Sequence, residues 1–82
     1  MPLTVLDTKG LPVTRRERIE DAVQTGGKNV SQSYEAWIAA DPFRSGVRVL
    51  ITGPQGFERA VFFATDEEAT EITRRVRETL EE

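Results

Sequence analysis

The sequence predicts a small α+β domain in which a helix, a three-stranded antiparallel meander and a second helix follow one another (αβββα). Apolar residues recur at helical spacing before residue 27 and after residue 65. Between these stretches the apolar period changes to two, which is typical of half-buried strands, and two turn signals divide that segment into three strands. Both helices are expected on one face of the sheet, because a small sheet buries its apolar face against helices.

The first helix is expected to begin at Thr14 and to end at Gly26 and Gly27. Thr14 and Glu17 have the spacing of a capping box, in which each side chain satisfies a free backbone N–H group. The glycine pair is expected to supply the positive φ angle that a helix C-cap favours. Three apolar residues at helical spacing form the inner stripe: Ile19, Ala22 and Val23.

The strands are expected at residues 33–40, 47–52 and 57–64, with turns at 41–46 and 53–56. The second turn fixes the register, because a three-residue loop with proline first and glycine last places the residues at either end of the turn opposite each other. Counting outward from that pair assigns eight residues to the face under the helices: Tyr34, Ala36, Ile38, Val47, Val49, Ile51, Val61 and Phe63.

The second helix is expected to begin at Thr65 or Asp66, because Thr65 and Glu68 form a second capping box. Its inner stripe follows a regular helical spacing: Ala69, Ile72, Val76 and Leu80. Two ion pairs at i,i+4 spacing are expected on its exposed side: Glu71–Arg75 and Arg77–Glu81.

The domain organisation is expected to comprise an N-terminal arm at residues 1–13 and a single αβββα domain at residues 14–82. The arm has no clear period, and Gly10 and Pro12 interrupt it. Three apolar residues in it could nevertheless form a short strand at the edge of the sheet: Leu3, Val5 and Leu6.

Composition excludes several classes of function. The 82-residue chain has no cysteine and no histidine, so it lacks disulfides, the commonest metal ligand and the usual general base near neutral pH. We therefore assign no catalytic residue, no metal ligand and no cofactor, and we do not expect an enzyme. The sequence has no apolar run long enough to span a membrane and no signal peptide, so a cytoplasmic location is the default expectation.

The face of the sheet turned away from the helices is the strongest candidate for a binding surface. Trp37, Leu50 and Phe62 come to it from three adjacent strands, and Arg48 sits opposite Phe62. Two helices can cover only one face, so an exposed apolar cluster of this kind predicts contact with a second copy, as a homodimer, or with another protein. The alternative is that the N-terminal arm buries the cluster, and a two-residue turn would instead bring Phe62 inward.

A cluster of cations occupies the first turn of the first helix: Arg15, Arg16 and Arg18. Cations oppose the helix dipole there, and together with free N–H groups they could hold an anion. The alternative is a solvated helix face on which Glu17, Glu20 and Asp21 neutralise the arginines.

Two hypotheses of function follow. The first is a small, non-catalytic protein-interaction module that self-associates through the outer sheet face. The second is a nucleic-acid-binding domain, because the element order resembles that of double-stranded-RNA-binding domains and of the arm-type DNA-binding domains of phage integrases. The first resemblance implies phosphate contacts at the start of the final helix, where this chain carries Asp66, Glu67 and Glu68. Because the net charge is also −3, nucleic acid is not the expected partner.

Overall fold

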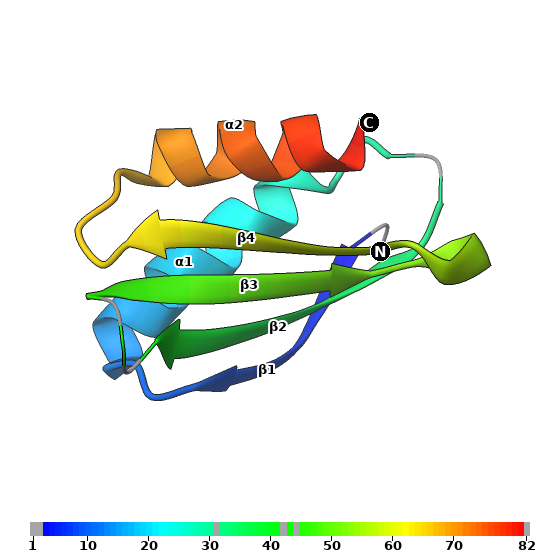
Figure 1. Cartoon of the computed structure of the whole chain (residues 1–82). Coiled ribbons are helices and arrows are strands. Elements are labelled where there is room, and N and C mark those ends of the chain that lie inside the picture. The colour runs from blue at the N-terminus through cyan, green and yellow to red at the C-terminus, as the bar shows by residue number, and fades with distance from the viewer. Residues whose placement is uncertain (1–2, 31, 42, 44, 82) are drawn as a thin grey trace.

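The computed structural model describes residues 3–30, 32–41, 43 and 45–81. These residues form four strands and two helices, and the predicted α+β fold with a short N-terminal strand is confirmed (Figure 1). In chain order the elements are β1 (Leu3–Lys9), α1 (Val13–Gly26), β2 (Tyr34–Asp41), β3 (Gly46–Thr52), a 3₁₀ turn η1 (Pro54–Gly56), β4 (Glu58–Ala64) and α2 (Ala69–Leu80).

The strands form one mixed sheet in the order β1-β2-β3-β4. The pairs β2–β3 and β3–β4 are antiparallel, as the meander predicts, whereas β1 pairs in parallel with β2. Helix α1 makes the crossover that a parallel pair requires. The register of β1 shifts between Val5 and Asp7, which breaks the period of two and explains why the sequence gives only a weak strand signal there.

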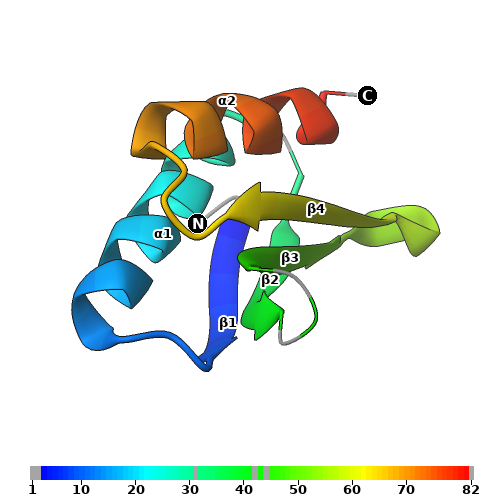
Figure 2. The same cartoon turned by 60° about the vertical axis from the view of Figure 1, so that its left-hand side comes forward.

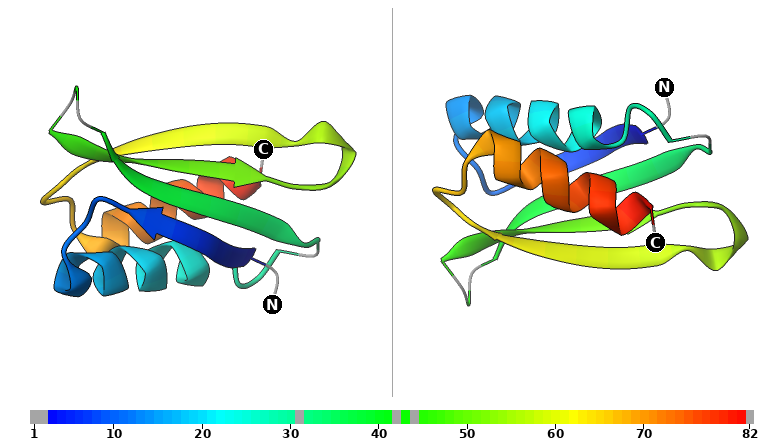
Figure 3. Two further views of the ribbon diagram at one scale, coloured as in Figure 1. Left: turned by 90° about the horizontal axis from the view of Figure 1, so that it is seen from below. Right: turned by 90° about the horizontal axis from the view of Figure 1, so that it is seen from above.

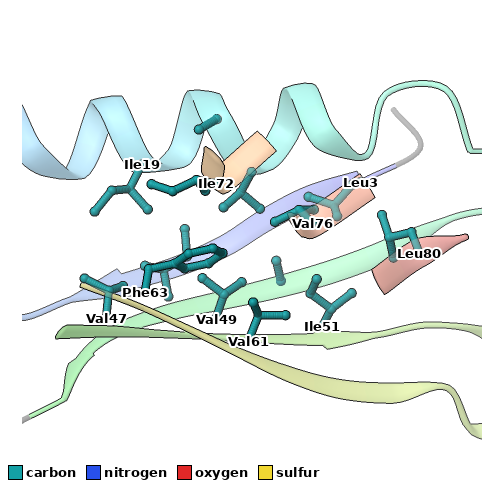
Figure 4. Close-up of a cluster of buried hydrophobic side chains, with 14 residues drawn as sticks. Leu3, Ile19, Val47, Val49, Ile51, Val61, Phe63, Ile72, Val76 and Leu80 are labelled. Atoms are coloured by element: carbon teal, nitrogen blue, oxygen red, sulfur yellow. The ribbon is translucent and has the colours of Figure 1, made fainter. Parts of the chain in front are cut away.

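Both helices lie on the same side of the sheet (Figure 2), so the molecule has two layers and one core. The register predicted from the second turn is confirmed, because Val49 pairs with Val61 and Val47 with Phe63. Figure 4 shows the resulting cluster between α1, α2 and the inner face of the sheet. Its buried members are Leu3, Ile19, Ala22, Val23, Ala36, Ile38, Val47, Val49, Ile51, Val61, Phe63, Ile72, Val76 and Leu80.

The turn between β3 and β4 closes through a hydrogen bond in which Gly53 N–H donates to the carbonyl of Phe57 at 3.0 Å. Gly56 takes the expected left-handed conformation, with φ of +77°. Gln55 also has a positive φ of 59°, which the sequence did not indicate because non-glycine residues visit this region rarely. In the turn between β2 and β3, residues 42 and 44 lie outside the part of the chain that the structure describes.

Both predicted helix starts are wrong. Helix α1 begins at Val13, with Pro12 as N-cap, and Arg16 N–H donates to the carbonyl of Pro12 at 2.8 Å. Thr14 therefore lies inside the first turn and does not cap it. The physical reason is that proline holds φ near −60°, a value suited to the entry of a helix.

Helix α2 begins at Ala69, with Glu68 as N-cap, four residues after the Thr65 start predicted from its capping box. Thr65 and Asp66 form a separate turn, in which Glu67 N–H donates to the carbonyl of Ala64 at 3.1 Å. The chain thus makes a separate backbone turn before α2, and the Thr65 side chain does not cap the helix.

The two glycines at the end of α1 serve a different purpose from the one predicted. Gly27 has φ of −99°, so it does not supply a positive φ angle. A methyl group on Gly26 would lie 2.7 Å from the carbonyl oxygen of Thr73, so glycine there lets α1 and α2 approach closely. Thr73 Oγ1 donates a hydrogen bond to the carbonyl of Ala22 at 3.1 Å and fixes the same crossing.

On the exposed side of α2, Arg74 pairs with Glu71 and with Glu78, at closest N–O distances of 2.5 Å. Glu71 was expected to pair with Arg75; instead Arg75 lies 4.8 Å from the centre of the Phe63 ring. The hydrogen bonds from Arg74 lower the pKa of the Glu71 carboxyl below its ordinary value of 4.5.

Candidate functional site

The face of the sheet opposite the helices, here called the outer face, is the candidate site. In the left view of Figure 3 the strands lie in front of both helices, and no element of the described chain crosses them. The N-terminal segment, which could have covered this face, instead extends the sheet as β1 beside β2. Strand pairing places the side chains of the outer face in three rows, each with one residue from every strand.

The middle row, called the apolar row, contains Asp7, Trp37, Leu50 and Ala60. Trp37 and Leu50 oppose each other directly on β2 and β3, and both are half-buried by their neighbours in the sheet. Ala60 is exposed. The side chain of Asp7 closes the row at the edge of the sheet.

The row at one end, called the acidic row, contains Thr4, Glu35, Thr52 and Glu58. Glu35 on β2 and Glu58 on β4 flank Thr52 on β3, and both glutamates are exposed. The two glutamates therefore stand two strands apart in the same row, with Thr52 between them.

The row at the other end, called the basic row, contains Lys9, Ala39, Arg48 and Phe62. Arg48 is exposed and opposes Phe62, which is 40% exposed, so the predicted residues Arg48 and Phe62 are neighbours. The four residues predicted as an interaction surface thus share one face, but their role in binding stays a prediction.

Sequence reasoning missed Lys9 as a second cation of this face. Finding Lys9 would have required placing β1, because the pairing of β1 with β2 brings Lys9 opposite Ala39. Lys9 Nζ lies 3.6 Å from Asp7 Oδ2 at the same edge. Asp41 follows the basic row on β2, and its Oδ1 accepts a hydrogen bond from Phe43 N–H at 3.0 Å, so the turn occupies this carboxylate.

Of the three arginines at the start of α1, two share a hollow and the third lies in another. Arg15 and Arg18 line a shallow hollow with Asp66, whereas Arg16 lines another with Glu20, on the side of β1. Each hollow contains a carboxylate, which opposes the entry of an anion. The anion site stays a prediction.

A groove of about 490 Å³ lies between the two helices. Ala22 and Ala69 line it, with Arg18, Arg74 and Arg77 beside them. Arg74 already forms hydrogen bonds with two glutamates of its own helix. On the outer face, by contrast, charged side chains and apolar side chains are exposed together, and we take that face as the candidate site.

Within residues 3–30, 32–41, 43 and 45–81, no three side chains of the metal-ligating types cluster, and no charged side chain is buried. Neither helix among these residues is long and apolar enough to cross a membrane.

Comparison of the chain with protein-family models, with curated proteins and with solved structures gives no match.

Proposed function

We propose that the protein is a small, non-catalytic interaction module that self-associates through the outer face of its sheet. The observation that carries the proposal is the apolar row, with Trp37 and Leu50 at its centre, on a face that no described element of the chain covers. Exposed apolar clusters bounded by charge are typical of protein–protein contact surfaces.

The driving force for self-association is the removal of apolar surface from water. Phe62 is 40% exposed, and Leu6 at the edge of the same sheet is 48% exposed. Each square ångström of apolar surface that a partner covers contributes about 25 cal/mol. A second copy presents the same apolar row, so two outer faces can cover each other.

The size of the outer face limits the strength of the complex. Four strands about 4.8 Å apart and seven residues with a rise of about 3.3 Å span roughly 19 by 23 Å. Two stacked faces of this size remove roughly 900 Å² from water, below the ~1,200–2,000 Å² of stable interfaces. We therefore expect a dimer that dissociates on dilution.

The test is the mass in solution of the wild type and of two variants, measured by sedimentation velocity over a wide concentration range. The wild type is expected to dimerise as concentration rises. Trp37→Asp and Ala60→Lys each place a charge in the apolar row, which would be desolvated in the dimer, so both are expected to stay monomeric. Ala60 is already exposed, so its replacement tests the face even if the Trp37 variant folds poorly.

Val13→Asp is the matched control, because Val13 is 57% exposed but lies on the helical side of the molecule. This variant is expected to dimerise like the wild type. Trp37 is the only tryptophan of the chain, so its fluorescence emission should shift to shorter wavelength as the dimer forms. A wild type that remains monomeric at every concentration would contradict the proposal.

A further inference from the structure

The charges at the two ends of the outer face distinguish between the ways in which two copies can stack. We infer that the two sheets pack face to face with their strands antiparallel, so that the acidic row of each copy meets the basic row of the other. This inference rests on the proposed self-association and adds the orientation of the partner.

Two copies that share one face are related by a two-fold axis, since a self-complementary interface is isologous. For stacked sheets this axis lies between them and runs either across the strands or along them. An axis across the strands reverses the strand direction and exchanges the two ends of the face. An axis along the strands leaves each end opposite the same end of its partner.

The axis across the strands, placed over the apolar row, brings the opposite charges of the two end rows together. At the edge of the apolar row it sets Asp7 over Asp7 of the other copy, where each Asp7 lies 3.6 Å from Lys9 Nζ of its own chain. It lays every strand on its own copy, so that Arg48 of one copy lies over Thr52 of the other. Thr52 stands between Glu35 and Glu58 in the acidic row, and Arg48 therefore points at the gap between two carboxylates. Stacked sheets rotate by about 30° relative to each other, and the long arginine side chain can follow this displacement.

Lys9 reinforces the same arrangement. In the stacked pair, Glu35 lies over Ala39 of the other copy, and Ala39 stands between Lys9 and Arg48 in the basic row. The acids occupy β2 and β4 whereas the cations occupy β1 and β3, so the two charge patterns interlock.

The axis along the strands gathers like charges instead. It places Glu35 and Glu58 of both copies at one end of the interface and Lys9 and Arg48 of both copies at the other. The apolar row is buried in either arrangement, so the apolar contribution is similar and the charges decide. Juxtaposed like charges disfavour an interface, and complementary ones fix its orientation.

The experiment uses charge reversal at the two ends of the face. Arg48→Glu removes the net positive charge of the basic row and places a carboxylate opposite the gap between Glu35 and Glu58 of the other copy. The double variant Glu35→Arg with Glu58→Arg makes the acidic row basic. Each variant alone then presents like charges across the antiparallel interface, so its self-association should weaken by about tenfold. Mixed together, the two variants should form a heterodimer at least as tight as the wild-type dimer.

Native mass spectrometry resolves the heterodimer, because the two variants differ in mass, and sedimentation velocity gives the affinities. Lys28→Glu and Glu17→Arg change the charge at exposed positions away from the outer face, so they serve as controls and should dimerise like the wild type. Circular dichroism confirms that each variant is folded.

The outcomes separate the two proposals. A wild type that never associates defeats the proposed function itself. A wild type that dimerises while Arg48→Glu dimerises more tightly would overturn the antiparallel arrangement. Replacing one of the two cations of each copy by a carboxylate relieves repulsion only when the basic rows of the two copies meet. Unchanged affinity in both variants, or no heterodimer in the mixture, would overturn it as well.

Discussion

The two faces of this sheet are built from alternate residues of the same strands, yet they are covered very differently. On β3, Val49 and Ile51 are fully buried beneath the helices, whereas Leu50 between them is only half-buried and Arg48 is exposed. Two helices therefore suffice for one face, and the sequence nevertheless places apolar residues on both. The proposed self-association would account for the apolar residues opposite the core, because a second copy would cover them.

The largest difference between the two faces is expected when neighbouring residues of β3 are truncated to alanine. Ile51→Ala leaves a cavity in the core and should lower the free energy of unfolding by about 3 kcal/mol. Leu50→Ala removes a side chain that is only half-buried in the monomer, so the free energy of unfolding should fall by about 1 kcal/mol or less. Urea unfolding of dilute protein measures the free energy of unfolding of both variants. Equal decreases would mean that Leu50 contributes as much to the stability of the monomer as the core residue Ile51.

A smaller effect is expected where the helices cross. In Gly26→Ala the new methyl group would lie 2.7 Å from the carbonyl oxygen of Thr73, so α1 and α2 must move apart. We expect a loss of about 1–3 kcal/mol in unfolding free energy, although alanine is the better helix former. The control is Thr25→Ala at an exposed position of the same helix turn, which should be close to neutral. A stabilised Gly26 variant would show that the helix layer tolerates more space than the distances imply.

The smallest effect concerns pH. The hydrogen bonds from Arg74 lower the pKa of Glu71 in the folded chain, so the unfolded chain binds this proton first as pH falls. The stabilisation is complete above about pH 4.5 and is lost as pH falls through the folded-state pKa. Glu71→Gln should therefore show a slightly smaller drop in melting temperature between about pH 6 and about pH 3 than the wild type.

Glu17→Gln on α1 provides the control for the loss of one exposed carboxylate. It should keep the wild-type pH dependence if the Arg74 contact is the cause. A pH dependence that is the same in the Glu71 variant and the wild type would mean that this ion pair forms only weakly in solution, as exposed pairs often do.

The sequence predicts the meander and its register well, because these depend on local signals. The order of Pro54, Gln55 and Gly56 was enough to place Val49 opposite Val61 and hence to separate inner from outer residues. The pattern of Ile72, Val76 and Leu80 was likewise enough to orient α2 on the core. Periodicity and turn chemistry act over a few residues, so a single sequence carries them.

The features that the sequence did not reveal depend on contacts between distant segments. Strand β1 pairs with β2 across the whole of α1, and its bulge removes the alternation that would mark it. Consequently the sequence did not place Lys9 in the same row as Arg48. The close crossing at Gly26 likewise depends on Thr73 of α2, a residue far away in the chain, so local rules suggested a C-cap instead.

The parallel pairing of β1 has a consequence for the order in which the elements of the protein fold. The β2–β3–β4 meander pairs neighbouring segments, whereas β1 pairs with β2 across the whole of α1, so we expect β1 to dock later. A molecule in which β1 has not docked lacks Leu3 in its core, leaves β2 as an open edge and lacks Lys9 at the cationic end of the outer face. Strand β1 thus supplies both Leu3 of the core and Lys9 of the basic row. The proposed self-association would therefore favour fully folded copies.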